Sequence, residues 1–208
     1  MKSVFKLAAT VILIGSVAAC GLIDRAGAAA VIGENSMSTD QVIAEYNSVM
    51  AALGDQAVPG TPIEINRALL SSYVVATLVD DIILKAGIEI DPAELKVVRA
   101  QLIADLGSEE ALIAAAASGA VAPQNIDRTL LTTIKFNAIG RYLDPNGTET
   151  TQSDASLAAI VEYAKIVGVE VAPRFGTWSN ESLSIAGDSN DVSITADALA
   201  ALTGQLAQ

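Results

Sequence analysis

The segment that decides the fold is "EINRALLSSYVVATLVDDIILKA", residues 64–86. Its apolar residues recur at helical spacing without keeping to one stripe; they are Ile65, Leu69, Val75, Leu78, Val79, Ile82 and Ile83. A helix that is apolar over more than one face needs neighbours on several sides. Gly87 follows directly, and glycine commonly ends a helix at this position. We therefore expect residues 64–86 to form the central helix of a helical core.

Helix signals also occur on both sides of this segment. Ser38 has Gln41 three residues later, which is the pattern of a capping box, and Asp91 followed by Pro92 is a strong helix start. Together with apolar spacing, such signals predict further helices at 38–53, 91–106, 108–118, 124–143 and 153–167. The residues between the last two, 144–152, contain Pro and Gly and are expected to form a turn and linker.

Two short strands are predicted near the ends of this helical region, at residues 29–32 and 169–175. Isolated strands are stable only when they pair. The expected fold class is therefore mainly α, with one short strand near each end pairing beside a helical body. We place this domain at residues 28–178 and a polar C-terminal tail at 179–208, in which a weak helix begins at Thr195.

The first twenty residues have the layout of a secretory signal peptide. Lys2 and Lys6 precede an uncharged stretch, residues 7–19, which is shorter than the roughly 20 apolar residues that a membrane-spanning helix needs. The stretch leads into Val17-Ala18-Ala19-Cys20, which resembles the lipobox of bacterial lipoproteins and holds the only cysteine. This resemblance implies that residues 1–19 are removed and that Cys20 carries a diacylglycerol, with no other cofactor. The alternatives are a buried apolar cysteine and an export signal cut elsewhere.

Charge and composition narrow the partners of the mature chain. Without residues 1–19 it keeps ten basic and 24 acidic residues, a net charge of −14. It therefore lacks a basic footprint for nucleic acid and a polybasic contact with anionic lipid. We expect the acyl group to anchor the protein on the extracytoplasmic face of the cell membrane, with residues 20–27 as a tether. A second cysteine is absent, so an internal disulfide is excluded.

Several catalytic chemistries lack their residues. The chain has no histidine, which excludes a Ser-His-Asp triad and an HExxH zinc site. No phosphate-binding glycine motif is present, so no nucleotide site is predicted. Residues 144–154 have proline and threonine where a calcium loop needs oxygen ligands. The acidic pairs at 80–81 and 109–110 point about 100° apart on a helix, so we expect solvated or capping acids. We predict neither a metal site nor a catalytic residue.

The order of these elements resembles the chaperone domain of SurA and PrsA-like extracytoplasmic foldases, particularly the short SurA N-terminal-like lipoproteins. The similar stretches are "AAAVIGENSMSTDQVIAEYN" at 28–47, "LLSSYVVATLVDDIILKAGIEIDPAELKVV" at 69–98 and "VEVAPRFGTWS" at 169–179. The resemblance implies that the terminal strands meet beside the helical body. In that family a parvulin isomerase domain often precedes the last helix and strand. Only about 30 residues separate Tyr142 from Pro173 here, so we predict no isomerase domain.

The apolar faces of 64–86 and 124–143 have two interpretations. They could line a groove for unfolded exported polypeptides, in which Tyr73, Phe136 and Tyr142 would be client-binding residues. They could instead bury each other in the core, which is the commoner role of an apolar helical stripe. The sequence leaves both interpretations open.

The stretch around Trp178 also has two interpretations. Arg174 and Trp178 flank Phe175 and Gly176 in a chain with few aromatic residues, which would suit a functional site. We favour a structural anchor, in which Gly176 permits a turn and Trp178 covers the paired strands.

The function expected from these features is that of a membrane-anchored chaperone-like protein that binds non-native exported polypeptides without ATP. An adaptor lipoprotein that docks one envelope partner is the alternative, and a prolyl isomerase is a third, less favoured interpretation. An enzyme is not predicted.

Overall fold

The computed structural model describes residues 26–187, and the fold is mainly α, as the sequence predicts. Its helices are α1 (Thr39–Leu53), α2 (Pro62–Ala86), α3 (Pro92–Leu106), α4 (Glu109–Ser118), α5 (Ile126–Leu143) and α6 (Glu149–Val167). Its strands are β1 (Ala28–Ile32), β2 (Asn35–Ser38), β3 (Val169–Val171), β4 (Thr177–Ser179) and β5 (Ser184–Ala186). Two short 3₁₀ turns are η1 (Pro123–Asn125) and η2 (Pro173–Phe175).

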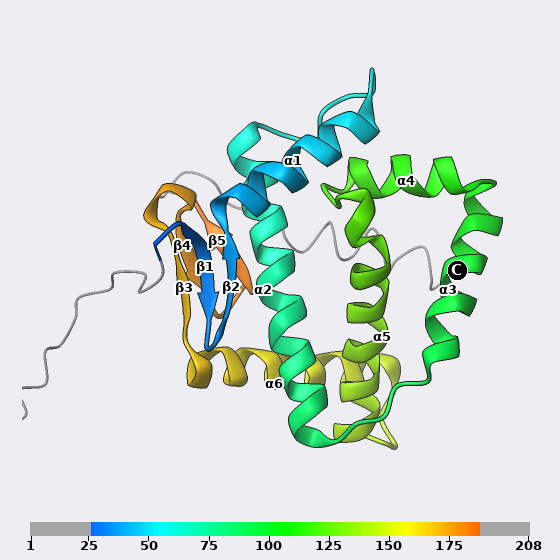
Figure 1. Cartoon of the computed structure of the whole chain (residues 1–208). Helices are drawn as coiled ribbons and strands as arrows, with labels where there is room; N and C mark the ends of the chain where they lie inside the picture. The colour runs from blue at the N-terminus through cyan, green and yellow to red at the C-terminus, as the bar shows by residue number, and fades with distance from the viewer. Residues whose placement is uncertain (1–25, 188–208) are drawn as a thin grey trace, which may run out of the picture.

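Helix α2 lies at the centre of the molecule, between the strands and α5 (Figure 1). Most of its apolar side chains are buried, and those of Leu70, Val74, Leu78 and Val79 are fully inaccessible. They form the main core together with residues of β1, α5 and α6. The predicted role of residues 64–86 as the central helix is therefore correct.

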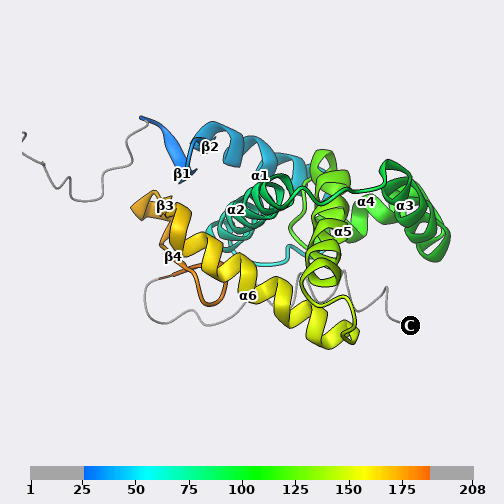
Figure 2. The same cartoon turned by 90° about the horizontal axis from the view of Figure 1, so that it is seen from below.

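Two smaller cores extend the main core along the helices. One joins the C-terminal half of α1 to the N-terminal half of α2 and to residues 117–122. The other lies between α3, α4 and the N-terminal half of α5. Helix α3 therefore packs at the edge of the molecule opposite the strands (Figures 1 and 2).

The two strands near the ends of the domain pair, as expected. β1 lies in the middle of a three-stranded antiparallel sheet with the order β2-β1-β3. Ala30 is opposite Val171 across the β1–β3 pair, and the Ala172 N–H donates to the Ala29 carbonyl at 2.9 Å. Ala29 and Ala30 are fully buried, because their small side chains let the sheet lie close to the main core.

Helix α6 runs across the C-terminal end of α5 (Figure 1), and the two helices are in close contact at Gly140. A Cβ at this position would lie 2.8 Å from the Ser156 Oγ and 2.8 Å from the Gln152 carbonyl carbon. The Ser156 hydroxyl donates to the Phe136 carbonyl at 2.7 Å, and Ser156 is fully buried. A glycine and a serine therefore set the distance between the two helices.

Two helices begin earlier than predicted. α6 starts at Glu149 rather than Ser153, since Thr148 caps it by accepting the Thr151 N–H at 3.3 Å. The predicted linker 144–152 is therefore partly helical. α2 starts at Pro62 rather than residue 64, and the Thr61 N–H donates to the Glu64 carboxylate at 2.5 Å. Threonine and proline at these positions are helix-start signals that the sequence interpretation assigned to loops.

The strands differ from the prediction in three ways. The strand predicted at 169–175 ends at Val171, because Pro173 has no N–H for a ladder and begins η2. β2 was not predicted, since it is a four-residue strand with polar residues at most positions. The chain also folds beyond Trp178: β4 and β5 form a hairpin in which Trp178 is opposite Ile185. The boundary at residue 178 is therefore too early.

Several predicted features lie outside the described residues. They are the signal peptide at 1–19, the lipidated Cys20, most of the tether at 20–27 and the weak helix from Thr195.

Candidate functional site

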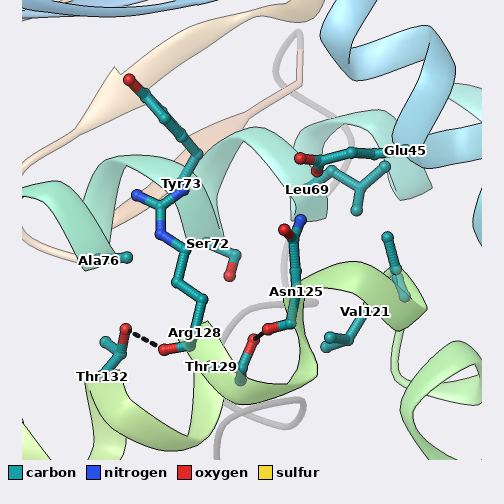
Figure 3. Close-up of a pocket in the computed structure, with 12 residues that line it drawn as sticks. Glu45, Leu69, Ser72, Tyr73, Ala76, Val121, Asn125, Arg128, Thr129 and Thr132 are labelled. Atoms are coloured by element: carbon teal, nitrogen blue, oxygen red, sulfur yellow. Dashed lines mark hydrogen bonds between the residues drawn. The ribbon is translucent and has the colours of Figure 1, made fainter. Parts of the chain in front are cut away.

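A polar cavity lies where α1, α2 and α5 meet (Figure 3). Glu45 enters it from α1, Ser72 and Tyr73 from α2, and Asn125 and Arg128 from η1 and the first turn of α5. Small apolar side chains line the remaining wall; they are Leu69, Ala76, Ala120, Val121 and Ala122. Charged and amide groups therefore face an apolar wall in one recess.

Glu45 and Asn125 form the acidic side of the cavity. In Figure 3 the Asn125 side chain points toward the Glu45 carboxylate. Burial raises the pKa of Glu45 above its ordinary value of 4.5, while Asn125 and the charge of Arg128 act in the opposite direction. The carboxylate is thus partly desolvated, and the effects of Asn125 and Arg128 only partly offset the cost of its burial.

Arg128 forms the basic side. Its guanidinium carbon lies 4.8 Å from the centre of the Tyr73 ring, a geometry typical of a cation–π contact. One terminal nitrogen is 3.4 Å from the Thr77 hydroxyl. Among residues 26–187 Arg128 forms no ion pair. The Tyr73 ring therefore orients the guanidinium, which keeps most of its donors for another group.

The local sequence explains this placement. Ala120 has φ of 57° and reverses the chain after α4, and its N–H donates to the Ala117 carbonyl at 2.9 Å. Pro123 then begins η1, which runs directly into α5. The Thr129 hydroxyl donates to the Asn125 carbonyl at 2.9 Å. This tight connection presents Asn125 and Arg128 to α1 and α2 on one side of α5.

The cavity is narrow. Its enclosed volume is about 20 Å³, beneath an open mouth. A bound water needs roughly 10–15 Å³ on this measure. The deep part therefore accommodates about one water molecule or the tip of a side chain, and a nucleotide or other large cofactor does not fit.

The three predicted client-binding residues do not come together. Tyr73 is partly buried and lines the cavity. Phe136 is partly buried and packs against the main core. Tyr142 is 59% exposed near the C-terminal end of α5. Only Tyr73 therefore belongs to the candidate site, and Phe136 takes the core role, which is the commoner of the two interpretations.

The apolar faces of α2 and α5 are mainly core. Large hydrophobic side chains that remain exposed are distributed over five helices and one loop; they are Ile43, Val58, Leu84, Val97, Tyr142, Leu143, Leu157 and Ile166. Of the two interpretations of the faces at 64–86 and 124–143, core packing is the one that most of their buried residues follow. The cavity lies at the edge of this contact.

The segment around Trp178 packs as part of the fold. Phe175 is 5% exposed and belongs to the main core, and the Arg67 Nε donates to its carbonyl at 2.7 Å. Gly176 has φ of 116°, and a Cβ there would collide with the Ala186 carbonyl oxygen. Trp178 is partly buried against the main core. These contacts hold the β4–β5 hairpin on the helical body.

Arg174, the other residue singled out in this segment, lies on the surface. Its guanidinium carbon is 5.1 Å from the centre of the Phe175 ring, and it donates to the Thr39 hydroxyl. These contacts link η2 to the start of α1.

The acidic pairs serve helix packing. Lys135 Nζ lies 2.7 Å from an Asp80 carboxylate oxygen, whereas Asp81 accepts the Tyr163 hydroxyl at 3.2 Å. Neighbouring acids on α2 thus contact different helices, α5 and α6. No group of three or more Asp, Glu, Cys or His side chains that could hold a metal ion occurs in residues 26–187.

In the second acidic pair the two side chains also separate. Glu109 forms an ion pair with Arg99, which also contacts Asp127 at 2.8 Å. Hydrogen bonds from its own backbone N–H and from Ser108 lower the pKa of Glu110. Glu109 therefore links α4 to α3, and Glu110 stabilises the helix start.

Sequence reasoning missed Glu45, Asn125 and Arg128. Glu45 looks like an ordinary surface acid on an amphipathic helix, and "QNIDR" at 124–128 looks like a helix start. Their proximity depends on the packing of α1, α2 and α5. A weak signal was available, since Asn125 and Arg128 are one helical turn apart on the same face.

Comparisons of this chain with protein-family models, with curated proteins and with solved structures find no match. Within residues 26–187, no helix combines the length and apolar character needed to cross a bilayer.

Proposed function

We propose that this protein is a membrane-anchored, extracytoplasmic chaperone-like lipoprotein that binds non-native exported polypeptides without ATP. The proposal includes lipidation of Cys20 and the loss of residues 1–19 as a signal peptide. It also includes kinship with the SurA N-terminal-like lipoproteins, in a form without an isomerase domain. In this proposal the protein binds its clients without catalysing a reaction on them.

The observation that carries the proposal is the pairing of β1 with β3 beside the helical body. These strands are separated by the whole helical region, yet Val31 is opposite Glu170 and Ile32 is opposite Val169. The foldase resemblance implies such pairing of the terminal strands. The helix order between them, with α2 at the centre, also agrees with that resemblance.

The cavity between α1, α2 and α5 supports a polypeptide ligand. It presents a donor group, Arg128, and an acceptor group, Glu45, beside an apolar wall. Polypeptides offer carbonyl and N–H groups together with apolar side chains, and a site with both kinds of contact suits them. Its narrow depth favours shallow and reversible contact over engulfment of a folded ligand.

The charge of the chain suits a soluble binder close to a membrane. The net charge at pH 7 is −12 for the full chain and −14 once residues 1–19 are removed. Such a charge keeps the protein dispersed and opposes self-association. Neither nucleic acid nor nucleotide is part of the proposal.

The test is suppression of client aggregation. The full chain in lipid nanodiscs would be added at increasing ratios to a chemically unfolded client, with light scattering as the readout and empty nanodiscs as the control. We expect dose-dependent suppression without nucleotide. Failure across several unrelated clients would contradict the proposal and favour an adaptor that docks one envelope partner.

A further inference from the structure

The cavity contains a donor and an acceptor whose hydrogen-bonding capacity is only partly used. A guanidinium has five N–H donors, and among the described residues Arg128 makes one side-chain hydrogen bond, at 3.4 Å to the Thr77 hydroxyl. An ionised carboxylate accepts about four hydrogen bonds, and Asn125 is the side chain that points toward Glu45 (Figure 3). A ligand that both accepts and donates would use the remaining capacity.

The charge balance of the cavity selects a neutral ligand. Glu45 and Arg128 are its charged residues, so their formal charges cancel at pH 7. An anion would be attracted by Arg128 but repelled by Glu45. A cation would be attracted by Glu45 but repelled by Arg128. A neutral group with an acceptor oxygen and a donor N–H avoids both penalties.

Several hydroxyls in the cavity already have acceptors. The Thr132 hydroxyl donates to the Arg128 carbonyl at 2.8 Å, and the Thr129 hydroxyl donates to the Asn125 carbonyl. These protons hold the backbone of α5 and are not available to a ligand. Arg128 and Glu45 are the charged groups that face a ligand here, beside the Ser72 hydroxyl and the Asn125 amide.

The depth of the cavity limits the ligand to a narrow group. The space for about one water accepts the planar tip of a side chain, which would replace that water and its hydrogen bonds. A main-chain amide has substituents on both its carbonyl carbon and its nitrogen, so it cannot enter this narrow recess end-on as a side-chain tip can.

We propose that this cavity binds the carboxamide tip of a glutamine or asparagine side chain in an extended segment of a bound polypeptide. The amide oxygen accepts from Arg128 and the amide N–H donates to Glu45, while the aliphatic stem lies against Leu69 and Ala76. This inference rests on the proposed function, because it specifies what part of a client the site recognises.

The test compares peptides that differ in one side chain. The probe is acetyl-Ala-Ala-Gln-Ala-Ala-N-methylamide, and its comparators carry glutamate or methionine in place of glutamine. Binding to the full chain in lipid nanodiscs is measured by isothermal titration calorimetry. We expect the glutamine peptide to bind at least tenfold more tightly than either comparator.

Two variants and a matched control locate the binding. Arg128→Lys keeps the charge but loses the planar fork, and we expect at least a tenfold loss of affinity for the glutamine peptide. Glu45→Gln should weaken binding about threefold or more, because it replaces a charged acceptor by a neutral one. Arg141→Lys changes an exposed arginine on the same helix and should leave affinity unchanged. Thermal melting of each variant verifies folding.

Equal binding of the three peptides, tighter binding of the glutamate peptide, or equal effects of Arg128→Lys and Arg141→Lys would each overturn the inference. The aggregation assay distinguishes failure of the carboxamide site from failure of the proposed function. Suppression of aggregation without glutamine selectivity refutes only the carboxamide site. Glutamine selectivity without suppression refutes the chaperone proposal and leaves the site in place.

Discussion

Replacement of Gly140 by alanine should destabilise the protein through the α5–α6 contact. Three atoms oppose a Cβ there: the Ser156 Oγ and the Gln152 carbonyl carbon, both at 2.8 Å, and the carbonyl oxygen of Gln152, which lies closer still. The two Gln152 atoms are backbone, so they can move only if α6 moves. Displacement of α6 would also strain the 2.7 Å hydrogen bond from Ser156 to Phe136.

The expected magnitude combines three effects. Overpacking a core costs about 1–3 kcal/mol, and a buried hydrogen-bonding group that loses its partner costs about 1–3 kcal/mol. Alanine in place of glycine within a helix recovers about 1 kcal/mol. The free energy of unfolding should therefore fall by about 3 kcal/mol, within a range of about 1–5. For a chain of this size, such a loss lowers the melting temperature by roughly 6–12 °C.

The assay is urea denaturation followed by circular dichroism, with Gly119→Ala as the control. Gly119 has φ of −89°, and the nearest atom to an added Cβ is the Ala116 carbonyl oxygen at 3.5 Å. The control should be neutral or stabilised by up to about 1 kcal/mol. If Gly140→Ala is as stable as the control, the close α5–α6 contact does not govern stability and the reasoning fails.

Three further predictions concern other parts of the chain. Trp178→Ala should lower the free energy of unfolding by about 2 kcal/mol, less than a fully buried tryptophan would, and an unchanged melting temperature would refute its anchoring role. Burial raises the pKa of Glu45, so stability falls as pH rises from the unfolded-state pKa through the folded one. Glu45→Gln should therefore gain stability relative to the parent chain as pH rises above the ordinary glutamate pKa of 4.5, and a parallel pH profile of the two in urea denaturation would argue against this. Cys20→Ser should abolish detergent-phase partitioning, and retained partitioning would disprove lipidation at Cys20.

Local signals in the sequence predicted most of the helices. The capping box at Ser38 and Gln41 is present, with N–H to oxygen distances of 2.7 and 3.2 Å. Asp91 caps α3 by accepting the Ala93 N–H at 2.8 Å. These contacts span two or three residues, so the residue types alone are sufficient to indicate them. The pairing of the terminal strands followed from a general rule, because an isolated strand needs a partner.

The candidate site could not be predicted in the same way. Glu45 and Arg128 are far apart in sequence, and only the packing of three helices brings them to one cavity. The β4–β5 hairpin was missed for a related reason, since its strands have three residues each and no clear alternation. The sequence indicated that α2 is apolar over more than one face. It did not indicate whether neighbouring helices or a ligand would cover these faces.

The most direct measurement is site-specific photocrosslinking to an unfolded client. A photoreactive amino acid replaces Ser72, an exposed residue at the cavity, and in a second variant replaces Val97, which is 67% exposed on α3. The full chain in lipid nanodiscs is mixed with client during dilution from denaturant and then irradiated. The proposal predicts crosslinks from position 72 that exceed those from position 97 and disappear when the client is already folded. Equal crosslinking from both positions, or none from position 72, would contradict polypeptide binding at the cavity.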